Sequence, residues 1–519
     1  MATLANSFSG SPSSTAIIIP EPRSSPLIIT YAQLSQHVTS LQSRLAALGL
    51  APQAAVSIAL PNSYAFVVAF LAASWQRAIA APLNPAYKQE EFEFYTDDLK
   101  SAIALVPRGS VAKDAAAVRA ARKYHAAIAE CYWDDAINEV VLDVKSSSNL
   151  SPQPIAHAQP SDVALVLHTS GTTGRPKAVP LTHRNLTTTM ANVTQTYHLT
   201  ARDRTLLVMP LFHVHGLLAA FLAPLLSGGS IIIPPAFSAS TFWTHFTTHA
   251  ATWYTAVPTI HQILLKSPPP SPLPDIRFIR SCSSPLSPSV FHALEKTFRA
   301  PVLEAYAMTE AAHQMTSNPL PPGKRMPGSV GVGQGVEVRI LNTEGKPLPT
   351  GKEGEICIRG ANVTAGYLNN AAANEAAFTP GERFFRTGDQ GKMDEEGYVF
   401  ITGRIKELIN KGGEKISPIE LDNVIAQHPH VAEAVSFAIE DEMYGQEVGV
   451  AVVLREGKAL GEDELRRWMG ERVAKFKVPK RVWITETMPK TATGKVQRRI
   501  VAETMLKMDK EGGGPKAKL

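Results

Sequence analysis

Residues 163–177 read VALVLHTSGTTGRPK, an apolar run followed by a loop with two glycines, four hydroxyl side chains and a lysine. The apolar part, 163–167, is typical of a buried strand. In the loop, glycines let the backbone approach an anion, hydroxyl and amide groups donate to phosphate oxygens, and Lys177 adds a positive charge. The loop residues with these properties are Thr169, Ser170, Gly171, Thr172, Thr173, Gly174 and Lys177. The stretch therefore predicts a phosphate-binding loop at the end of a strand.

This loop does not have the spacing of a Walker A motif. Only two residues separate Gly171 from Gly174, and Ala178 follows Lys177 where a Walker A loop has Ser or Thr. A second apolar run, 178–181, comes next instead of a helix. An ordinary surface turn is the alternative explanation, and the four hydroxyls behind a buried strand favour phosphate binding over it.

The sequence on either side alternates between helical and extended patterns. Residues 30–48 have helical spacing and end before a glycine, and 64–75 are again helical. Residues 55–60 and 79–83 read as short buried strands. Strands that alternate with helices indicate an α/β fold. From Val336 the pattern changes to short strands with Gly and Pro turns, which predicts a β-rich subdomain over 336–403.

The last part of the chain, 404–519, is more charged and reads as a smaller α+β domain. We therefore place a domain boundary at residue 404, with residues 1–403 forming the larger domain. Within the larger domain, 267–274 (SPPPSPLP) predicts a rigid surface connector.

Composition excludes several classes of protein. The 519 residues are 44% hydrophobic and 19% charged, as in an ordinary folded protein, and the net charge of +5 is too small to indicate nucleic-acid binding. The three cysteines are far apart and form no CxxC motif, so we expect no disulfide framework and a reducing compartment. The longest apolar run, 217–226, is too short for a membrane span, which takes about 20 residues.

Five segments in order along the chain resemble the motifs of one superfamily, that of AMP-forming acyl-CoA synthetases, luciferases and adenylation domains. They are the loop 169–177, YAMTE at 306–310, TGD at 387–389, GRIK at 403–406 and PKTATGK at 489–495. The resemblance implies a large N-terminal domain of two α/β layers plus the β-rich subdomain, followed by a small mobile α+β domain.

One position departs from the superfamily pattern. Arg77 stands where these proteins usually have glycine, on a turn from helix to strand. We expect this substitution to affect packing and not chemistry.

The resemblance also implies ATP, Mg²⁺ and coenzyme A as ligands, and a role for each motif. Glu310 is the expected Mg²⁺ ligand, since a hard cation prefers carboxylate oxygen. Thr309 donates to the α-phosphate, Asp389 accepts from the ribose hydroxyls, and Arg404 adds a ribose or phosphate contact. Lys495 is the lysine of the adenylation step, at which negative charge builds up between carboxylate and phosphate.

Two further sets of residues follow from the same resemblance. Ser283, in a Ser-Ser-Pro loop, is expected on one side of the adenine, and Glu304, Ala305 and Tyr306 on the other. Lys406 is the expected hinge of the small domain, whose rotation brings residues 410–415 to the thiol for the second half-reaction. An ordinary surface lysine is the alternative for Lys406.

The segments expected to line the acid pocket are polar. They contain His213, Ser281 and His313, which could hold a second carboxylate on the acid. Residues 210–220 and 304–321 resemble the oxalate–CoA ligase branch of fungal and plant enzymes, so oxalate is the favoured acid. A structural role for His213 and His215 is the alternative.

Other functions remain open at this stage. They are a medium-chain or aromatic acyl-CoA ligase, a luciferase-like oxygenase and a non-catalytic protein with the same fold; the polar pocket disfavours the oxygenase, and the complete motif set disfavours the non-catalytic protein. His245 and His249 have a spacing that could face a metal, but the segment HFTTH lacks the glutamate of HExxH. We expect them to be polar residues of a surface helix.

The chain ends with a glycine-rich tail and the tripeptide Ala517, Lys518, Leu519. This tripeptide resembles the SKL-type address that a peroxisomal import receptor reads. A chance lysine-rich tail is the alternative. The expected location is the peroxisome, and a second pool in the cytoplasm is compatible with this expectation.

Overall fold

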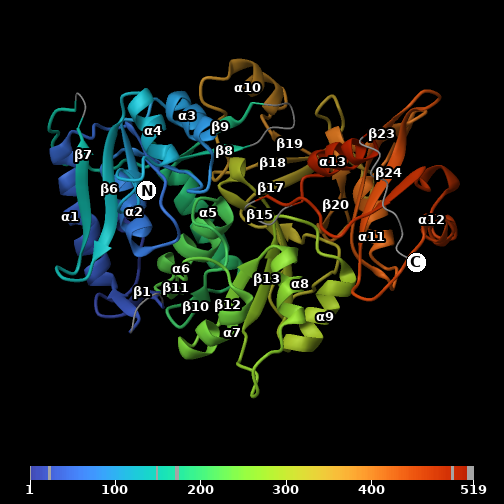
Figure 1. Cartoon of the computed structure of the whole chain (residues 1–519), viewed down its shortest axis with the longest axis horizontal. Coiled ribbons are helices and arrows are strands. Elements are labelled where there is room, and N and C mark those ends of the chain that lie inside the picture. The colour runs from blue at the N-terminus through green and yellow to red at the C-terminus, as the bar shows by residue number, and fades with distance from the viewer. Residues whose placement is uncertain (1, 21–24, 148–149, 170–174, 492–495, 511–519) are drawn as a thin grey trace.

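The computed structural model describes residues 2–20, 25–147, 150–169, 175–491 and 496–510. The strands of these residues form four sheets. In Figure 1 the two sheets formed by the first part of the chain lie with their helices at the left and centre of the molecule. The sheet nearest the C-terminus, which contains β23 (Val431–Asp441) and β24 (Gly445–Leu454), lies at the right.

The first sheet has the order β7-β6-β5-β3-β4-β8-β9. Its strands are β3 (Ala55–Ile58), β4 (Ile79–Pro82), β5 (Ile103–Val106), β6 (Ala127–Asp134), β7 (Glu139–Ser146), β8 (Val163–Thr169) and β9 (Lys177–Thr182). The inner pairs are parallel, and the edge strands β7 and β9 are antiparallel to their neighbours. Helices α3 (Gln89–Asp98) and α4 (Ala116–Lys123) pack on this sheet.

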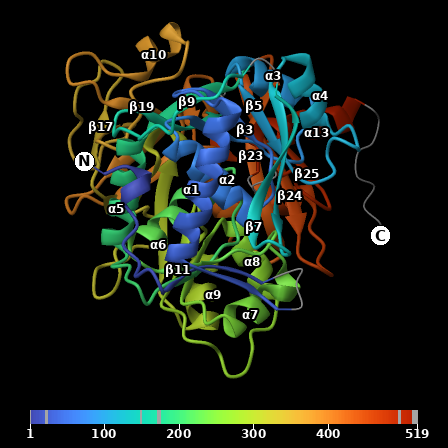
Figure 2. The ribbon, with the colours of Figure 1, turned by 90° about the vertical axis from the view of Figure 1, so that its left-hand side faces the viewer.

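Helix α2 (Tyr64–Trp75) lies inside the molecule. Its sequence is apolar on all sides, and every residue from Tyr64 to Ser74 is buried, as expected of a helix with no solvent-facing side. It packs beside α1 (Tyr31–Leu48), as Figures 1 and 2 show. The largest apolar cluster contains both helices and strands of three of the four sheets, so α2 lies in a core that these layers share.

The second sheet has the order β16-β15-β14-β13-β12-β10-β11-β1-β2. Its strands are β1 (Thr15–Ile19), β2 (Leu27–Thr30), β10 (Arg204–Leu206), β11 (Ser230–Ile232), β12 (Trp253–Ala256), β13 (Phe278–Cys282), β14 (Val302–Met308), β15 (His313–Ser317) and β16 (Val332–Gly333). Strands β1 and β10–β14 run parallel to their partners in the centre.

Helices cover both faces of this second sheet. One face packs α7 (Ala239–Thr248), α8 (Pro258–Lys266) and α9 (Pro288–Phe298). The other packs α5 (His183–Thr196), the π-helical segment η2 (His215–Leu222) and α6 (Ala223–Leu226). Because side chains alternate along a strand, neighbouring residues of β13 face different helices.

Two smaller sheets complete the chain. The third contains β17 (Glu337–Leu341), β18 (Gly354–Arg359), β19 (Phe385–Met393) and β20 (Val399–Arg404), with α10 (Ala371–Ala377) beside it. The fourth contains β21 (Ile409–Lys411), β22 (Glu414–Ile416), β23 (Val431–Asp441), β24 (Gly445–Leu454) and β25 (Arg481–Ile484). Helices α11 (Pro418–Ile425), α12 (Glu462–Gly470) and α13 (Arg498–Lys510) accompany it.

The expected fold class, α/β layers with a β-rich subdomain and a small α+β part, is confirmed. The expected helices and strands around residues 30–83 occur within two residues of their predicted bounds. His245 and His249 lie on α7 and directly after it, and α7 has a solvent-exposed face with Thr244, Thr247 and Thr248. His245 itself is buried at 5% exposure, and His249 is partly exposed. The described residues contain no cluster of three or more metal-ligating side chains.

Arg77 shows how the departure from the superfamily pattern is accommodated. Its φ is +62°, in the left-handed region that favours glycine. The guanidinium donates to Asp162 at 2.8 and 3.0 Å and so ties the end of α2 to the start of β8. Arginine at this position therefore adopts a backbone conformation that glycine reaches more easily, and its side chain forms an ion pair with Asp162.

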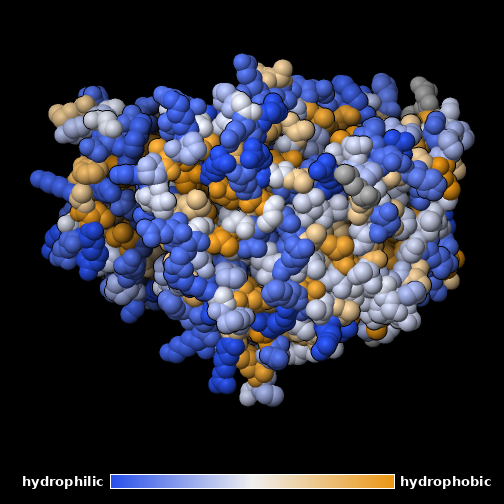
Figure 3. Space-filling view, turned by 180° about the vertical axis from the view of Figure 1, so that it is seen from behind, coloured by the Kyte–Doolittle hydropathy of each residue, from blue (hydrophilic) through white to orange (hydrophobic). Residues whose placement is uncertain are grey.

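None of the described helices has the length and apolar character needed to cross a membrane. Seen from behind, the surface is a mixture of hydrophilic side chains and scattered apolar groups (Figure 3).

Candidate active site

The predicted phosphate loop connects two antiparallel strands. Thr169, at the end of β8, pairs with Lys177, at the start of β9. Ser170, Gly171, Thr172, Thr173 and Gly174 lie outside the described residues.

Lys177 and Glu310 are linked by a residue that the sequence interpretation missed. The Nζ of Lys177 lies 4.5 Å from the ring centroid of Tyr367, a cation–π contact. The hydroxyl of the same tyrosine donates to Oε1 of Glu310 at 2.9 Å. Tyr367 therefore holds the expected phosphate lysine and the expected metal carboxylate in one unit. The sequence offered no charge or spacing at Tyr367 that marks this role.

Glu310 is buried where β14 ends. It lies in the 3-10 turn Thr309–Ala311, with 7% of its surface exposed, while Thr309 beside it is partly exposed. Burial raises the pKa of Glu310 above its usual value. A dehydrated carboxylate of this kind is stabilised by a cation. One carboxylate suits Mg²⁺, which commonly takes its other ligands from phosphates and water.

Asp389 lies at the centre of a second group. It faces Arg404 across β19 and β20, and the guanidinium Nε donates to Oδ1 at 2.9 Å. The hydroxyl of Tyr306 donates to Oδ2. These contacts hold the carboxylate in one orientation. They also keep Arg404, which is partly exposed at its side chain, beside the place where a ribose would meet Asp389.

Glu304 ties together two loops beside the expected adenine position. Its carboxyl accepts a hydrogen bond from the Gly328 N–H at 2.9 Å and another from the Leu286 N–H. Glu304 and Ala305 pair with Ser281 and Cys282 on β13, just before Ser283. Burial raises the pKa of Glu304 to about 8.

This raised pKa predicts a pH-dependent stability that Glu304→Gln should remove. The folded chain retains a proton that the unfolded chain loses near its ordinary pKa, so this stabilisation is complete below about 4.5 and disappears as the pH rises through 8. Wild type should lose up to about 1.4 kcal/mol of unfolding free energy per pH unit in this window through this group. Glutamine keeps the acceptor and does not titrate.

Urea unfolding between pH 5 and pH 9 measures the effect. The two proteins should converge at acid pH, and the glutamine variant should be the more stable above pH 8. Parallel pH profiles would contradict this prediction.

The structure groups His215, Ser283 and His313. Nδ1 of His215 is 3.1 Å from Oγ of Ser283, and its ring stacks on that of His313 with centroids 5.3 Å apart. Both histidines are fully buried. Ser283 and His313 have φ of +76° and +103°. Such conformations cost about 1–3 kcal/mol in a non-glycine residue and occur preferentially at functional sites.

His213 and Ser281 are placed differently from this cluster. His213 is partly exposed just before η2, and its Nδ1 accepts from the backbone N–H of His215 at 3.2 Å. Ser281 follows Arg280 on β13, so strand alternation directs it to the face that packs α8 and α9. Its Oγ is buried and has no hydrogen-bond partner among the described residues. The sequence places His215 two residues after His213, in the segment HVH. The sequence interpretation assigned a role in the acid pocket to His213 only.

The remaining predicted residues belong to the last part of the chain. Lys406 is exposed in the 3-10 turn Ile405–Glu407, directly after β20. Residues 410–415 lie in the β21–β22 hairpin. Lys495 and the tail residues Ala517, Lys518 and Leu519 lie outside the described residues.

Known proteins match this chain over most of its length. Residues 5–368 match a family described as AMP-binding enzyme, and residues 420–495 match the AMP-binding enzyme C-terminal domain. The chain is 47% identical to the oxalate–CoA ligase of Saccharomyces cerevisiae over 517 residues, 95% of each protein. It is 49% identical to the oxalate–CoA ligase of Arabidopsis thaliana over 488 residues, 92% of this chain and 94% of that protein.

Among solved structures, ATP-bound MatB from Rhodopseudomonas palustris is similar over nearly the whole length. The TM-score is 0.87 at 29% identity, covering 97% of this chain and 99% of that one.

Proposed function

This chain belongs to the family of AMP-binding enzymes, and from that premise we propose that it is an ATP-dependent ligase that joins oxalate to coenzyme A. In the first half-reaction a carboxylate oxygen attacks the α-phosphate, and pyrophosphate leaves. In the second, the coenzyme A thiolate attacks the acyl carbon of the adenylate, and AMP leaves. Mg²⁺, when bound, neutralises phosphate charge during the first step.

The nucleotide end of the site has the groups that this chemistry needs. An anion attacks another anion in the first step, so positioned cations and hydrogen-bond donors carry most of the catalysis. Lys177 and the loop 169–174 hold the phosphates, and Glu310 holds the metal ion. Asp389 receives the ribose hydroxyls, and Thr309 and Arg404 supply further donors. Lys495 stabilises the charge that builds up at the α-phosphate.

The small domain, 404–519, alternates between two orientations relative to 1–403 in this proposal. One orientation presents Lys495 for adenylation. Rotation about Lys406 replaces it with the hairpin that contains 410–415, which then faces the thiol.

The observation that carries the choice of acid is the cluster of the fully buried His215 and His313 with the partly buried Ser283. In this proposal the backbone of Ser283 borders the adenine, and its hydroxyl faces the acid. A long or aromatic acid needs an apolar lining, whereas a second carboxylate needs donors at short range. The cluster stands beside Glu310, since His313 follows it by three residues. His213 adds a further polar group next to this cluster, since its Nδ1 accepts from the backbone N–H of His215, whereas Ser281 faces the other side of β13. The names of the yeast and plant relatives support the same acid.

One assay tests the proposal. AMP release in the presence of coenzyme A is measured with oxalate, malonate, acetate, octanoate and coumarate. The kcat/KM for oxalate should exceed that for octanoate or coumarate by roughly 100-fold. An apolar acid leaves the buried hydrogen-bond donors of the pocket unpaired, and this loss weakens its binding in the transition state. Preference for octanoate or coumarate would replace oxalate with the medium-chain or aromatic alternative.

The C-terminal tripeptide supports a proposal about location. We expect a fluorescent protein fused to the N-terminus of the full chain to enter peroxisomes, because the fusion leaves Ala517, Lys518 and Leu519 free for the import receptor. Deleting these residues should move the fusion to the cytosol. Punctate fluorescence that persists after the deletion would contradict this proposal.

A further inference from the structure

Arg280 is a fully buried cation in the middle of β13. Its exposed fraction is 0%, and no carboxylate among the described residues pairs with it. Burying an unpaired charge is expensive, so such a group is normally held by several hydrogen bonds and by a functional requirement. The proposed nucleotide chemistry does not use this guanidinium.

Neutral oxygen atoms surround the guanidinium instead. Nε donates to the hydroxyl of Tyr197 at 2.7 Å, and one terminal nitrogen donates to Oε1 of Gln314 at 3.3 Å. The other terminal nitrogen donates to Oγ1 of Thr255 at 3.2 Å. The full positive charge of Arg280 therefore persists in a low-dielectric interior, where it acts strongly on nearby groups.

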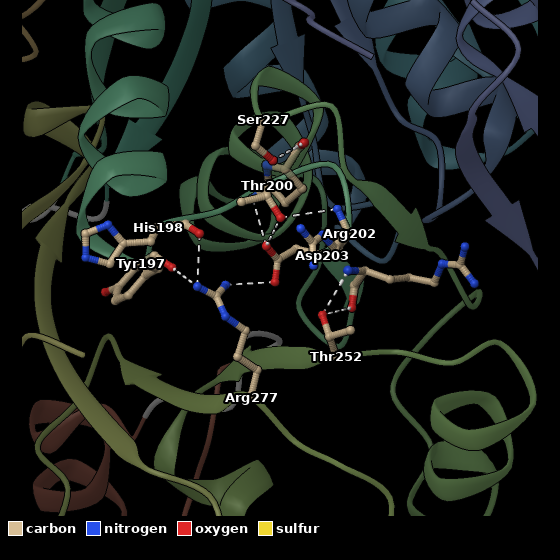
Figure 4. Close-up of polar contacts among 10 residues, drawn as sticks. Tyr197, His198, Thr200, Arg202, Asp203, Ser227, Thr252 and Arg277 are labelled. Atoms are coloured by element: carbon tan, nitrogen blue, oxygen red, sulfur yellow. Dashed lines mark hydrogen bonds and ion pairs between the residues drawn. The ribbon is translucent and has the colours of Figure 1, made fainter. Parts of the chain in front are cut away.

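A separate arginine on the same segment holds the frame of this arrangement. Arg277 donates to the backbone oxygens of Tyr197 and His198 at 2.7 and 2.9 Å and pairs with Asp203 at 2.8 Å (Figure 4). Tyr197 is thus held at its backbone by Arg277 and at its hydroxyl by Arg280. This leaves the guanidinium of Arg280 little freedom to move.

The contact with Thr255 continues to the acid pocket. Nε2 of His215 lies 2.6 Å from Oγ1 of Thr255, and Nδ1 lies 3.1 Å from Oγ of Ser283. Arg280, Thr255, His215 and Ser283 therefore form one hydrogen-bonded chain. It runs from a buried cation on β13 to the hydroxyl of the pocket.

The charge at one end determines the direction of the hydrogens. A guanidinium only donates, so Thr255 accepts from Arg280 and is left with its own hydrogen to place. Among the described residues its other contact is His215, so the threonine donates to Nε2. The imidazole hydrogen is then on Nδ1 and points to Oγ of Ser283. The serine accepts from His215, and its own hydrogen is free for a ligand.

We infer that Arg280 is a positioning residue that makes Ser283 a hydrogen-bond donor toward the second carboxylate of the acid. This inference rests on the proposed function, since it assigns a cause to the selectivity of the same pocket. Without the cation, Thr255 can donate elsewhere, His215 can adopt its other tautomer, and Ser283 can turn its lone pairs toward the acid. A dianionic acid is then bound more weakly, while ATP is not.

Thr255→Val and Thr255→Ser test the chain with matched variants. Valine keeps the shape and removes the hydroxyl, and serine keeps the hydroxyl. Thr255→Val should raise KM for oxalate by about tenfold or more with KM for ATP within about twofold, and Thr255→Ser should restore the wild-type KM. Arg280→Met should shift the two KM values in the same pattern.

Arg277→Met is the control for structural damage. It removes a cation from the same segment and the hydrogen bond to the backbone oxygen of Tyr197, so it should lower the melting temperature without changing KM for oxalate. Equal changes in both KM values for Thr255→Val, or an Arg277→Met effect on oxalate equal to that of Arg280→Met, would overturn the inference. If Arg280→Met does not fold, the comparison of Thr255→Val with Thr255→Ser alone tests the inference. Failure of wild type to use oxalate would instead refute the proposed function.

Discussion

Glu310→Gln is expected to lower the rate of adenylate formation by about three orders of magnitude while leaving the fold intact. The substitution removes a buried carboxylate that lies at the end of β14 and adjoins the Lys177–Tyr367 contact. A neutral amide is a poor ligand for Mg²⁺ and does not offset the charge of the metal ion. Glutamine still offers Oε1 to the hydroxyl of Tyr367, so the local hydrogen bond survives.

The loss of activity can be separated from a loss of stability. Burial raises the pKa of Glu310 and thus makes its charged form unfavourable in the apo protein, so the variant should melt at the wild-type temperature or above it. Exchange of radioactive pyrophosphate into ATP, measured over a range of Mg²⁺ concentrations, reports the first half-reaction.

Glu130→Gln provides a matched control. Glu130 is equally buried and accepts a hydrogen bond from Val111 N–H at 2.9 Å on a different sheet. It should retain normal exchange. Near-normal exchange in Glu310→Gln would remove this residue from the metal site.

Lys495→Ala and Lys406→Pro are expected to damage opposite half-reactions. Loss of Lys495 should slow adenylation by about 100-fold or more, because the cation proposed to neutralise the charge that develops between carboxylate and α-phosphate is then missing. Lys406→Pro fixes φ at residue 406 and disfavours the present turn conformation of Ile405. It should spare adenylation within about threefold and slow thioester formation by roughly 100-fold, because the domain cannot rotate.

Each half-reaction is measured by itself. Pyrophosphate exchange reports the first, and coenzyme A-dependent release of AMP from a preformed enzyme-bound adenylate in a single turnover reports the second. Lys406→Ala keeps the backbone free and removes only an exposed charge, so it should behave as wild type in both. Equal loss of both half-reactions in Lys406→Pro would contradict rotation about this residue.

The elements around the phosphate loop were predictable because their signals are local. The helices α1 and α2 and the strands β3, β4 and β8 follow from periodicity and from turn residues within a few positions. The motif residues Glu310, Asp389 and Arg404 were also accessible, since each lies in a short segment that resembles a known pattern. The role of Tyr367 could not be predicted from the sequence, because it depends on contacts with two residues that lie 57 and 190 positions away in the chain.

The burial of His245 shows the same limit in a single helix. The sequence predicts a surface helix that carries two polar histidines, and only tertiary packing decides that His245 is buried. The spacing of residues along a helix does not by itself give the environment of each side chain.

By itself, the sequence of this protein determined which chemistry was available: a loop expected to bind phosphate, a carboxylate expected to bind a metal ion, an aspartate expected to meet the ribose, and a set of polar residues expected near the acid. Those are properties of residue types in short segments. Only the tertiary structure decided that His215 and Ser283, and not the neighbouring His213 and Ser281, form the hydrogen-bonded cluster. The physical reason is that strand alternation and a left-handed turn determine the face to which each side chain points. The same alternation buries Arg280 beside Thr255, a contact between residues 25 positions apart that no local pattern contains.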